Sequence, residues 1–388
     1  MRKKQILCAI LAATVLVGNG ATVHAESIQP QSSKDAATYQ EVEPNDDRMD
    51  ATVIPMNQQC MGILETGKGE RDVDWYKVTK TENGYIQLKF DIDISKWHDR
   101  IGNGWDIYVY DSQFREIDKY RVVRNSFTGK ALPYKKGDYY IKVTQNSYDV
   151  EVPYGITVAQ VKSDSWEQEG NDTQTTANVI NLNKQYSGYI EDDVAKDWYE
   201  INLKKDAVVK FSLARGNNLT VEQVQSIGTG WQMVVYRASS GSIVEEVKNI
   251  TERKDCTVEL KKGKYYIRVS ANDVYYAWTP TDIPYKLKVS NADIPGKTKI
   301  QKATGSKKTV TIKWKRVAGA SGYYVYRSNS KNGAYRRVAT LKGAAKTTYK
   351  NQKLKSGKTY YYKVAAYRKA NGVTAVAKQC TAKAVKAK

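Results

Sequence analysis

The sequence predicts an all-β protein made of two related β-sandwiches, of the jelly-roll-like kind, and a smaller immunoglobulin-like sandwich. The first observation is an internal repeat, since several short motifs occur twice in the same order, most of them 126 positions apart. Such a period indicates two copies of one domain. The second is a series of short segments in which β-branched and aromatic residues alternate with polar ones, as in half-buried strands. The third is that no long helical periodicity interrupts these segments, which favours sandwiches.

The chain begins with a segment typical of secretion. A basic start precedes an apolar run over residues 6–17, and small residues follow around position 24. We expect a signal peptide over residues 1–25, because a membrane anchor, the alternative, needs a longer apolar run. Residues 26–40 lack periodicity and are expected to form a flexible leader. Since no later segment is apolar enough to be a transmembrane segment, the mature protein is expected to be secreted, and possible retention at the cell wall stays open.

The two repeats cover residues 41–160 and 166–290. The opening Glu-Val-Glu-Pro-Asn-Asp of the first returns as Glu-Gln-Glu-Gly-Asn-Asp in the second. An Asp-Trp-Tyr segment and a Gly-x-Tyr-Tyr-Ile segment also occur once in each repeat. The Lys-Lys-Gly before each Tyr-Tyr strand predicts a turn, because glycine tolerates the backbone angles that turns require.

The third predicted domain covers residues 295–388 and follows a linker that ends in Pro295-Gly296. Val310, Ile312 and Trp314 alternate with polar residues, so we expect them to share the buried face of a strand. The length and the strand pattern suit an immunoglobulin-like sandwich.

Charge is divided unevenly along the chain. Residues 295–388 contain 25 Lys and Arg and no acidic residue, whereas residues 26–294 contain 34 basic and 41 acidic residues, a net charge of −7. A basic domain of this kind is expected to bind an anionic cell-wall polymer or another polyanion in a salt-sensitive way. For a secreted protein, nucleic acid is an unlikely partner. The alternative is a lysine-rich surface that serves solubility alone.

The motifs of the two repeats resemble those of the bacterial pre-peptidase C-terminal domain, a family that includes the collagen-binding domains of clostridial collagenases. The resemblance lies in the acidic opening, in Gly62 and Gly188, and in the Asp-Trp-Tyr and Gly-x-Tyr-Tyr-Ile strands. The third domain resembles the fibronectin type III domains of Gram-positive bacteria. There Trp314 is placed on the second strand, and Leu354 with Tyr360 resembles the tyrosine corner.

This resemblance implies calcium ligands in the acidic opening of each repeat and at the aspartates near the aromatic strand. In the first repeat these are Glu41, Glu43, Asn45, Asp46, Asp72 and Asp74. In the second repeat they are Glu167, Glu169, Asn171, Asp172 and Asp197. Clustered carboxylates and amide carbonyls can supply the roughly six to eight oxygens that calcium takes. We expect a bound calcium to be structural, because it would tie the opening segment to the sandwich.

Two observations limit this implication. Asn and Asp after Pro44 could form only a turn, in which they bond their own backbone. The second repeat also departs from the first, because Gly170 replaces Pro44 and Ala195 stands where Asp72 would be. Asp192 or Asp193 could compensate for that loss.

In the collagen-binding relatives, exposed tyrosines receive collagen. Strand tyrosines of this chain stand at 108, 110, 139 and 140, and at 236, 265 and 266. Because neighbours in a strand point to opposite faces, about half of them should face outward. They could equally complete the sandwich, so no ligand-binding residue is assigned. We expect Trp75 and Trp198 to be core residues.

The sequence favours a binding protein over an enzyme. The histidine that remains after the signal peptide is His98, and motifs such as His-Glu-x-x-His or Gly-x-Ser-x-Gly are absent from the sequence. Cys60, Cys256 and Cys380 are expected to be three separate thiols. We therefore expect attachment to an extracellular matrix protein or polysaccharide. The alternatives are a wall-retained spacer and an accessory substrate-binding protein for a secreted peptidase.

Overall fold

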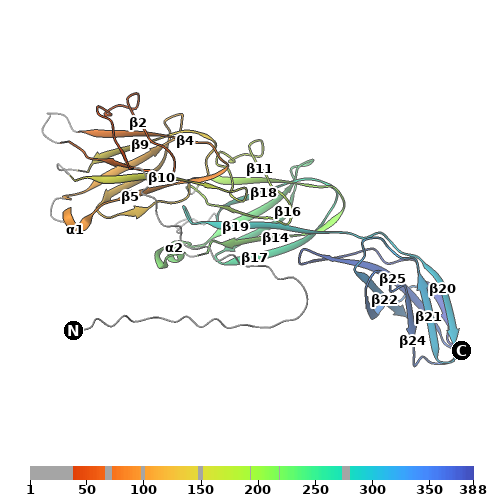
Figure 1. The fold of residues 1–388 in the computed structure, drawn as a ribbon. Helices are drawn as coiled ribbons and strands as arrows, with labels where there is room; N and C mark the ends of the chain where they lie inside the picture. The colour runs from red at the N-terminus through yellow and green to blue at the C-terminus, as the bar shows by residue number, and fades with distance from the viewer. Residues whose placement is uncertain are drawn as a thin grey trace, which may run out of the picture. The chain divides into compact units, whose positions relative to one another are not determined.

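The computed structural model describes residues 38–65, 72–97, 101–146, 152–192, 194–217, 219–272 and 280–388. Its regular structure is almost entirely β-strand, as the sequence predicts (Figure 1). The predicted signal peptide, most of the predicted leader, His98 and Asp193 lie outside the described residues. Within the described ranges, no helix is long and apolar enough to cross a membrane.

The first repeat forms two five-stranded sheets, β1-β3-β10-β5-β8 and β2-β4-β9-β6-β7. The elements are β1 (Tyr39–Gln40), β2 (Thr52–Val53), β3 (Gln59–Gly62), β4 (Val73–Lys80), β5 (Gly84–Asp91), α1 (Ile94–Trp97), β6 (Trp105–Tyr110), β7 (Glu116–Val123), β8 (Phe127–Thr128), β9 (Gly137–Gln145) and β10 (Tyr154–Lys162). Alternation places Tyr76 and Val78 of β4 in the core between the sheets, with Phe90 and Trp105.

The end of the predicted leader overlaps the first described strand. Tyr39 and Gln40 form β1, which pairs parallel with β3 at Cys60 and Met61. Because β1 runs directly into the acidic opening at Glu41, this pairing fixes the start of the opening against the first sandwich. The last two residues of the expected leader, residues 26–40, therefore lie in β1.

The second repeat has the strand order of the first, in the five-stranded sheet β11-β13-β18-β15-β16 and the four-stranded sheet β12-β19-β14-β17, except that β1 has no counterpart among its described strands. Its elements are β11 (Asn178–Val179), β12 (Gln185–Gly188), β13 (Lys196–Leu203), β14 (Ala207–Arg215), α2 (Val221–Gln225), β15 (Trp231–Arg237), β16 (Ile243–Ile250), β17 (Arg253–Leu260), β18 (Gly263–Ala271) and β19 (Tyr285–Asp293). Its core contains Tyr199, Phe211 and Trp231. The repeat in sequence is therefore a repeat in topology.

The third sandwich contains the sheets β20-β21-β24 and β23-β22-β25-β26, and β27 also pairs with β25. Its strands are β20 (Ile300–Ser306), β21 (Thr309–Trp314), β22 (Gly322–Ser328), β23 (Arg336–Lys342), β24 (Thr348–Asn351), β25 (Thr359–Ala370), β26 (Val373–Val376) and β27 (Lys383–Lys386). Val310, Ile312 and Trp314 are buried together, as predicted. The Tyr360 hydroxyl accepts a hydrogen bond from the Lys355 backbone N–H at 3.0 Å, the contact expected of a tyrosine corner.

The three thiols are free, and each lies in a different sandwich. Cys60 is buried in the first core and Cys380 in the third, while half-buried Cys256 packs against the second core. This confirms the expectation of separate thiols that pack as small apolar groups.

Candidate functional site

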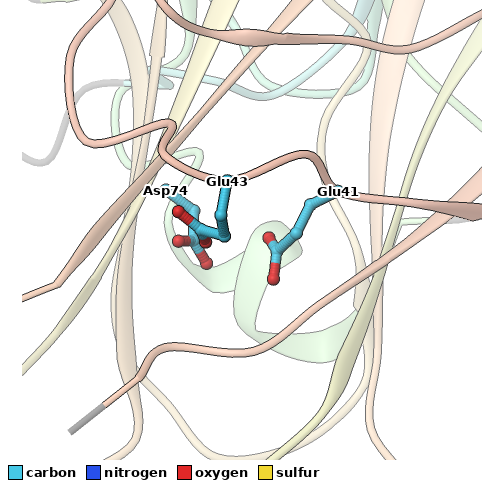
Figure 2. A group of neighbouring side chains, drawn as sticks. All are labelled: Glu41, Glu43 and Asp74. Carbon is cyan, nitrogen blue, oxygen red and sulfur yellow. The ribbon is translucent and has the colours of Figure 1, made fainter.

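Three of the predicted ligands of the first repeat meet at β4. Glu41 and Glu43 lie on the segment after β1, and Asp74 lies on β4 with its side chain buried. One carboxylate oxygen of each lies within 4.8 Å of the others, and Figure 2 shows the three side chains turned toward a common point. We call these three residues the first acidic cluster. The Trp75 backbone N–H donates to the Asn45 carbonyl at 2.9 Å, which holds the opening segment against β4.

Two buried tyrosines connect the carboxylates of this cluster. The Tyr76 hydroxyl donates to Glu41 and lies 2.7 Å from the Tyr154 hydroxyl, which donates to Asp74. Gly62 lies against this network, since a Cβ built there would be 2.2 Å from the Tyr76 hydroxyl oxygen. Only glycine leaves room for the hydroxyl at this position.

Burial and the neighbouring acids disfavour the ionised forms of the carboxyl groups in this cluster. Burial raises the pKa of Asp74 to about 9, and the neighbouring Glu41 carboxylate adds to the rise. Burial also raises the pKa of Glu41, although Tyr76 and the Ile63 N–H donate to it. Like charges that share a buried site oppose ionisation of one another. A bound cation would reverse this effect.

The other predicted ligands of the first repeat lie beside the cluster. Asp72 is half-buried, and burial together with neighbouring Asp46 raises its pKa. Asn45 is fully buried, and its side-chain amide lies 3.2 Å from the Thr52 hydroxyl. Asn45 therefore positions the opening segment.

The second repeat builds a more deeply buried version of the same network. Glu167, Glu169, Asn171 and Asp197 are all buried, and we call them the second acidic cluster. Two tyrosines again connect the acids. The Tyr199 hydroxyl donates to Glu167 at 2.7 Å, and the Tyr285 hydroxyl donates to Asp197 at 2.5 Å. The remaining predicted ligand, Asp172, is exposed.

Two oxygens of the second acidic cluster have no hydrogen-bond partner among the described residues. They are Oε1 of Glu169 and Oδ1 of Asn171, and both are buried. Burial, followed by the charge of Glu167, raises the pKa of Glu169 well above its ordinary value. An unpaired buried oxygen is costly, and oxygen-only ligand sets are those that hard divalent cations prefer.

Sequence reasoning missed the buried tyrosines that donate hydrogen bonds to the acids of the two clusters, and it also missed Glu191. Tyr154 and Tyr285 each follow a proline, in Pro153-Tyr154 and Pro284-Tyr285, and that shared dipeptide could have identified them. The Tyr134 hydroxyl donates to Glu191. Asp192, considered as a substitute ligand, accepts backbone hydrogen bonds from Val194 and Ala195 at one carboxylate oxygen.

Aromatic side chains gather on the outer surface of one sheet in each repeat. The first aromatic face consists of Trp75, Tyr108, Tyr110, Phe114 and Tyr140, and the second of Trp198, Tyr236 and Tyr266. The ring centroids of Trp75 and Tyr110 are 5.5 Å apart, and those of Trp198 and Tyr236 are 5.3 Å apart. Lysine or arginine lies over both faces, for example Lys142 at 5.7 Å from the Trp75 ring.

The expectation that both tryptophans are core residues is wrong for Trp75. Tyr76 takes the inward position on β4, so its neighbour Trp75 faces outward and is half-buried. On β13, Tyr199 is inward and Trp198 is buried on the other side, against Tyr236 and Tyr266. Tyr139 and Tyr265 are buried, whereas Tyr140 and Tyr266 are half-buried, as alternation predicts.

Comparison with known proteins finds partial structural likenesses. The pre-peptidase C-terminal domain of a collagenase from Bacillus anthracis is 21% identical, with a TM-score of 0.23, over 29% of this chain and 94% of that chain. An Fn3-like protein from Clostridium thermocellum is 26% identical, with a TM-score of 0.17, over 21% of this chain and 85% of that chain. A β-1,2-glucanase from Parabacteroides distasonis is 13% identical, with a TM-score of 0.20, over 53% of this chain and 32% of that chain. No family model and no curated protein matches the sequence. The β-sandwich assignment therefore rests on the strands and their order.

Proposed function

We propose that this chain is a secreted, non-catalytic binding protein that attaches to an extracellular matrix protein or polysaccharide through its two aromatic faces. The observation that carries the proposal is the recurrence of an outward aromatic group on the same sheet of both repeats. Tyrosine and tryptophan bury large areas at low entropic cost, which makes them effective contact residues. Two linked faces would add avidity without any new contact.

We propose further that calcium binds both acidic clusters and acts structurally. The close carboxylates of Glu41, Glu43 and Asp74 and the unpaired oxygens of Glu169 and Asn171 support this assignment. The ion would supply the positive charge that offsets their mutual repulsion. The chain's own residues do the rest: the tyrosine pairs orient the acids, and the N–H groups of Trp75 and Trp198 hold the opening segments.

The third sandwich is proposed to contact an anionic cell-wall polymer. Its 25 basic residues face no acid within residues 295–388. Some of the cations lie on aromatic rings, since Arg337 is 4.7 Å from the Tyr324 ring and Lys363 is 4.1 Å from the Tyr335 ring. The excess of positive charge also favours the second candidate function, a wall-retained spacer whose attachment is electrostatic.

The test is binding of the full chain to immobilised collagen and to purified Gram-positive cell wall, with calcium or chelator and across a salt series. Tyr110→Ala and Tyr236→Ala alter one aromatic face each. Tyr39→Ala is the matched control, because Tyr39 is an exposed tyrosine on the other sheet of the first sandwich. We expect each face variant to weaken collagen binding by about tenfold, as for an interface residue worth about 1.4 kcal/mol.

Each outcome separates the two candidates. Salt-tolerant collagen binding that the face variants weaken and Tyr39→Ala does not supports the adhesin. Wall binding that salt abolishes, without collagen binding, supports the spacer. Equal losses in all three variants would contradict a role for the aromatic faces.

A further inference from the structure

A hollow of about 660 Å³ lies on the outer surface of the sheet β12-β19-β14-β17, and Asn371 and Gly372 of the third sandwich also line it. Its basic side chains come from three adjacent strands: Lys210 and Arg215 from β14, Lys286 and Lys288 from β19, and Arg253 from β17. Alternation turns the three lysines outward, because core residues such as Phe211 occupy the inward positions.

Small side chains stand beside the lysines and leave the space open. Across the β14–β19 pair, Ser290 is opposite Lys210, Ser212 is opposite Lys288, and Ala214 is opposite Lys286. No aromatic residue is among the described residues that line the hollow. The site is therefore a shallow polar depression with positive charges along it.

The charges of the hollow are only partly neutralised. Asp255 pairs with Arg253 at 3.0 Å and with Lys210 at 3.5 Å. Within the described ranges, no carboxylate lies at ion-pair distance from Lys286 or Lys288. This basic depression stands out because residues 26–294 as a whole carry a net charge of −7.

The first repeat shows that the sandwich does not need these lysines. Tyr154 and Tyr285 occupy the same place in the two tyrosine pairs, so Thr157 corresponds to Lys288 and Gly155 to Lys286. By the same register, Gln87 corresponds to Lys210, since Gln87 pairs with Ala159 as Lys210 pairs with Ser290. Three neutral positions of the first repeat are thus lysines in the second, which points to a ligand of that surface.

We propose that this hollow binds a linear phosphodiester polymer that lacks aromatic groups. Lys286 and Lys288 are two residues apart on one strand, a spacing of about 7 Å, and Lys210 lies on the neighbouring strand. A row of charges suits a chain of regularly spaced anions better than a single ion. Lysine meets phosphate as a point charge, while bases and sugar rings would favour aromatic platforms that the hollow lacks. The inference extends the proposed polyanion contact from the third sandwich to the second.

The test compares two triple variants of the full chain. The hollow variant is Lys210→Gln, Lys286→Gln and Lys288→Thr, in which Gln and Thr at 210 and 288 are the residues of the first repeat. The control variant is Lys196→Gln, Lys204→Gln and Lys205→Gln, which removes equal charge from exposed lysines of the same sandwich outside the hollow. Circular dichroism melting first verifies that both variants fold.

The probe is poly(glycerol phosphate), titrated at several salt concentrations. Each lost phosphate contact makes the slope of log K against log salt less steep by about 0.7 to 0.9, so three lost contacts should make the slope of the hollow variant less steep by about 2 to 3. We expect the control variant to keep nearly the wild-type slope. If the slope changes by the same amount in both variants, only net charge matters and the hollow is not a binding site.

Two further results would overturn the inference in different ways. Salt-sensitive binding that persists undiminished in the hollow variant would leave the polyanion contact of the third sandwich standing and refute the site proposed here. Tighter binding of oligothymidylate or heparin than of the phosphate polymer, dependent on the same three lysines, would assign the hollow to another ligand class. Absence of wild-type binding to any polyanion would refute both proposals.

Discussion

At the residue scale, the acidic clusters depend on glycines that leave room for buried hydroxyl and carboxylate groups. A Cβ built at Gly188 would lie 2.6 Å from both Glu167 carboxylate oxygens and from the Tyr285 hydroxyl. A Cβ built at Gly296 would meet nothing nearer than 3.8 Å. The same residue type is therefore essential at one position and replaceable at the other.

Gly188→Ala should lower the free energy of unfolding by about 1 to 3 kcal/mol, the usual cost of overpacking a well-packed interior. Gly296→Ala should leave it nearly unchanged. Urea unfolding at fixed pH in the presence of a chelator measures both values. Similar stabilities for the two variants would mean that the Glu167 network yields without cost.

Lys80 predicts a pH effect at the same scale. It is a buried cation whose ammonium group donates to the Gly84 carbonyl at 2.8 Å and also to the Tyr134 carbonyl. Burial, with some repulsion from Lys136, lowers its pKa from 10.5 to about 8. Between these values the unfolded chain binds more protons than the folded one, so stability attributable to Lys80 rises as the pH rises.

We therefore expect the free energy of unfolding of the wild type to increase relative to that of Lys80→Met between about pH 8 and pH 10.5. Below pH 8 the difference between the two proteins should stay constant. Chemical denaturation at a series of pH values gives this difference directly. A flat difference across the whole range would show that Lys80 keeps an ordinary pKa.

At the element scale, the two faces of β4 and of β13 have different roles. On β4, Asp74 and Tyr76 point inward to the acidic cluster, and Trp75 points outward to the aromatic face. A calcium ion bound at Asp74 would therefore brace the strand whose other side presents the proposed contact surface. The opening segment is joined to the same strand through Trp75 and Asn45.

Calcium should raise the melting temperature of the wild type. At a calcium concentration one hundred times the dissociation constant, binding at one site stabilises the folded state by about 2.7 kcal/mol. The double variant Glu43→Gln with Asp74→Asn should lose the calcium-dependent shift of the first sandwich while keeping the shape of both side chains. Glu116→Gln, an exposed acid on β7, is the control. Calorimetry with calcium and with chelator compares the three proteins, and an unchanged shift in the double variant would contradict the first site.

At the scale of the whole molecule, the sequence predicted the strands, the repeat and the gathering of Glu41, Glu43 and Asp74. The strands and the repeat follow from local alternation and from the order of motifs, whereas the grouping of the three acids was implied by the family resemblance. The sequence could not place Tyr154 beside Asp74, because that contact joins strands eighty positions apart. The basic hollow was also hidden, since its lysines become neighbours only through the pairing register of β14 and β19.

The outward direction of the Trp75 side chain shows a second limit of prediction from the sequence. A bulky residue in an apolar segment is usually buried, yet each strand has one inward row, and Tyr76 occupies it here. Which residue of the pair faces inward depends on what the core provides, in this case a hydroxyl partner for Glu41. The alternation of side chains is visible in the sequence. Which of the two alternating rows faces the core depends on contacts with residues distant in the chain.

The placement of one thiol in each sandwich gives the molecule three independent reporters of local opening. Cys60 and Cys380 are shielded by their own cores, and Cys256 is partly shielded by the second. An alkylating reagent reaches a shielded sulfur only when the surrounding sandwich opens. Mass spectrometry of the alkylated peptides over time would therefore follow the local opening of each sandwich within the intact chain, without any substitution.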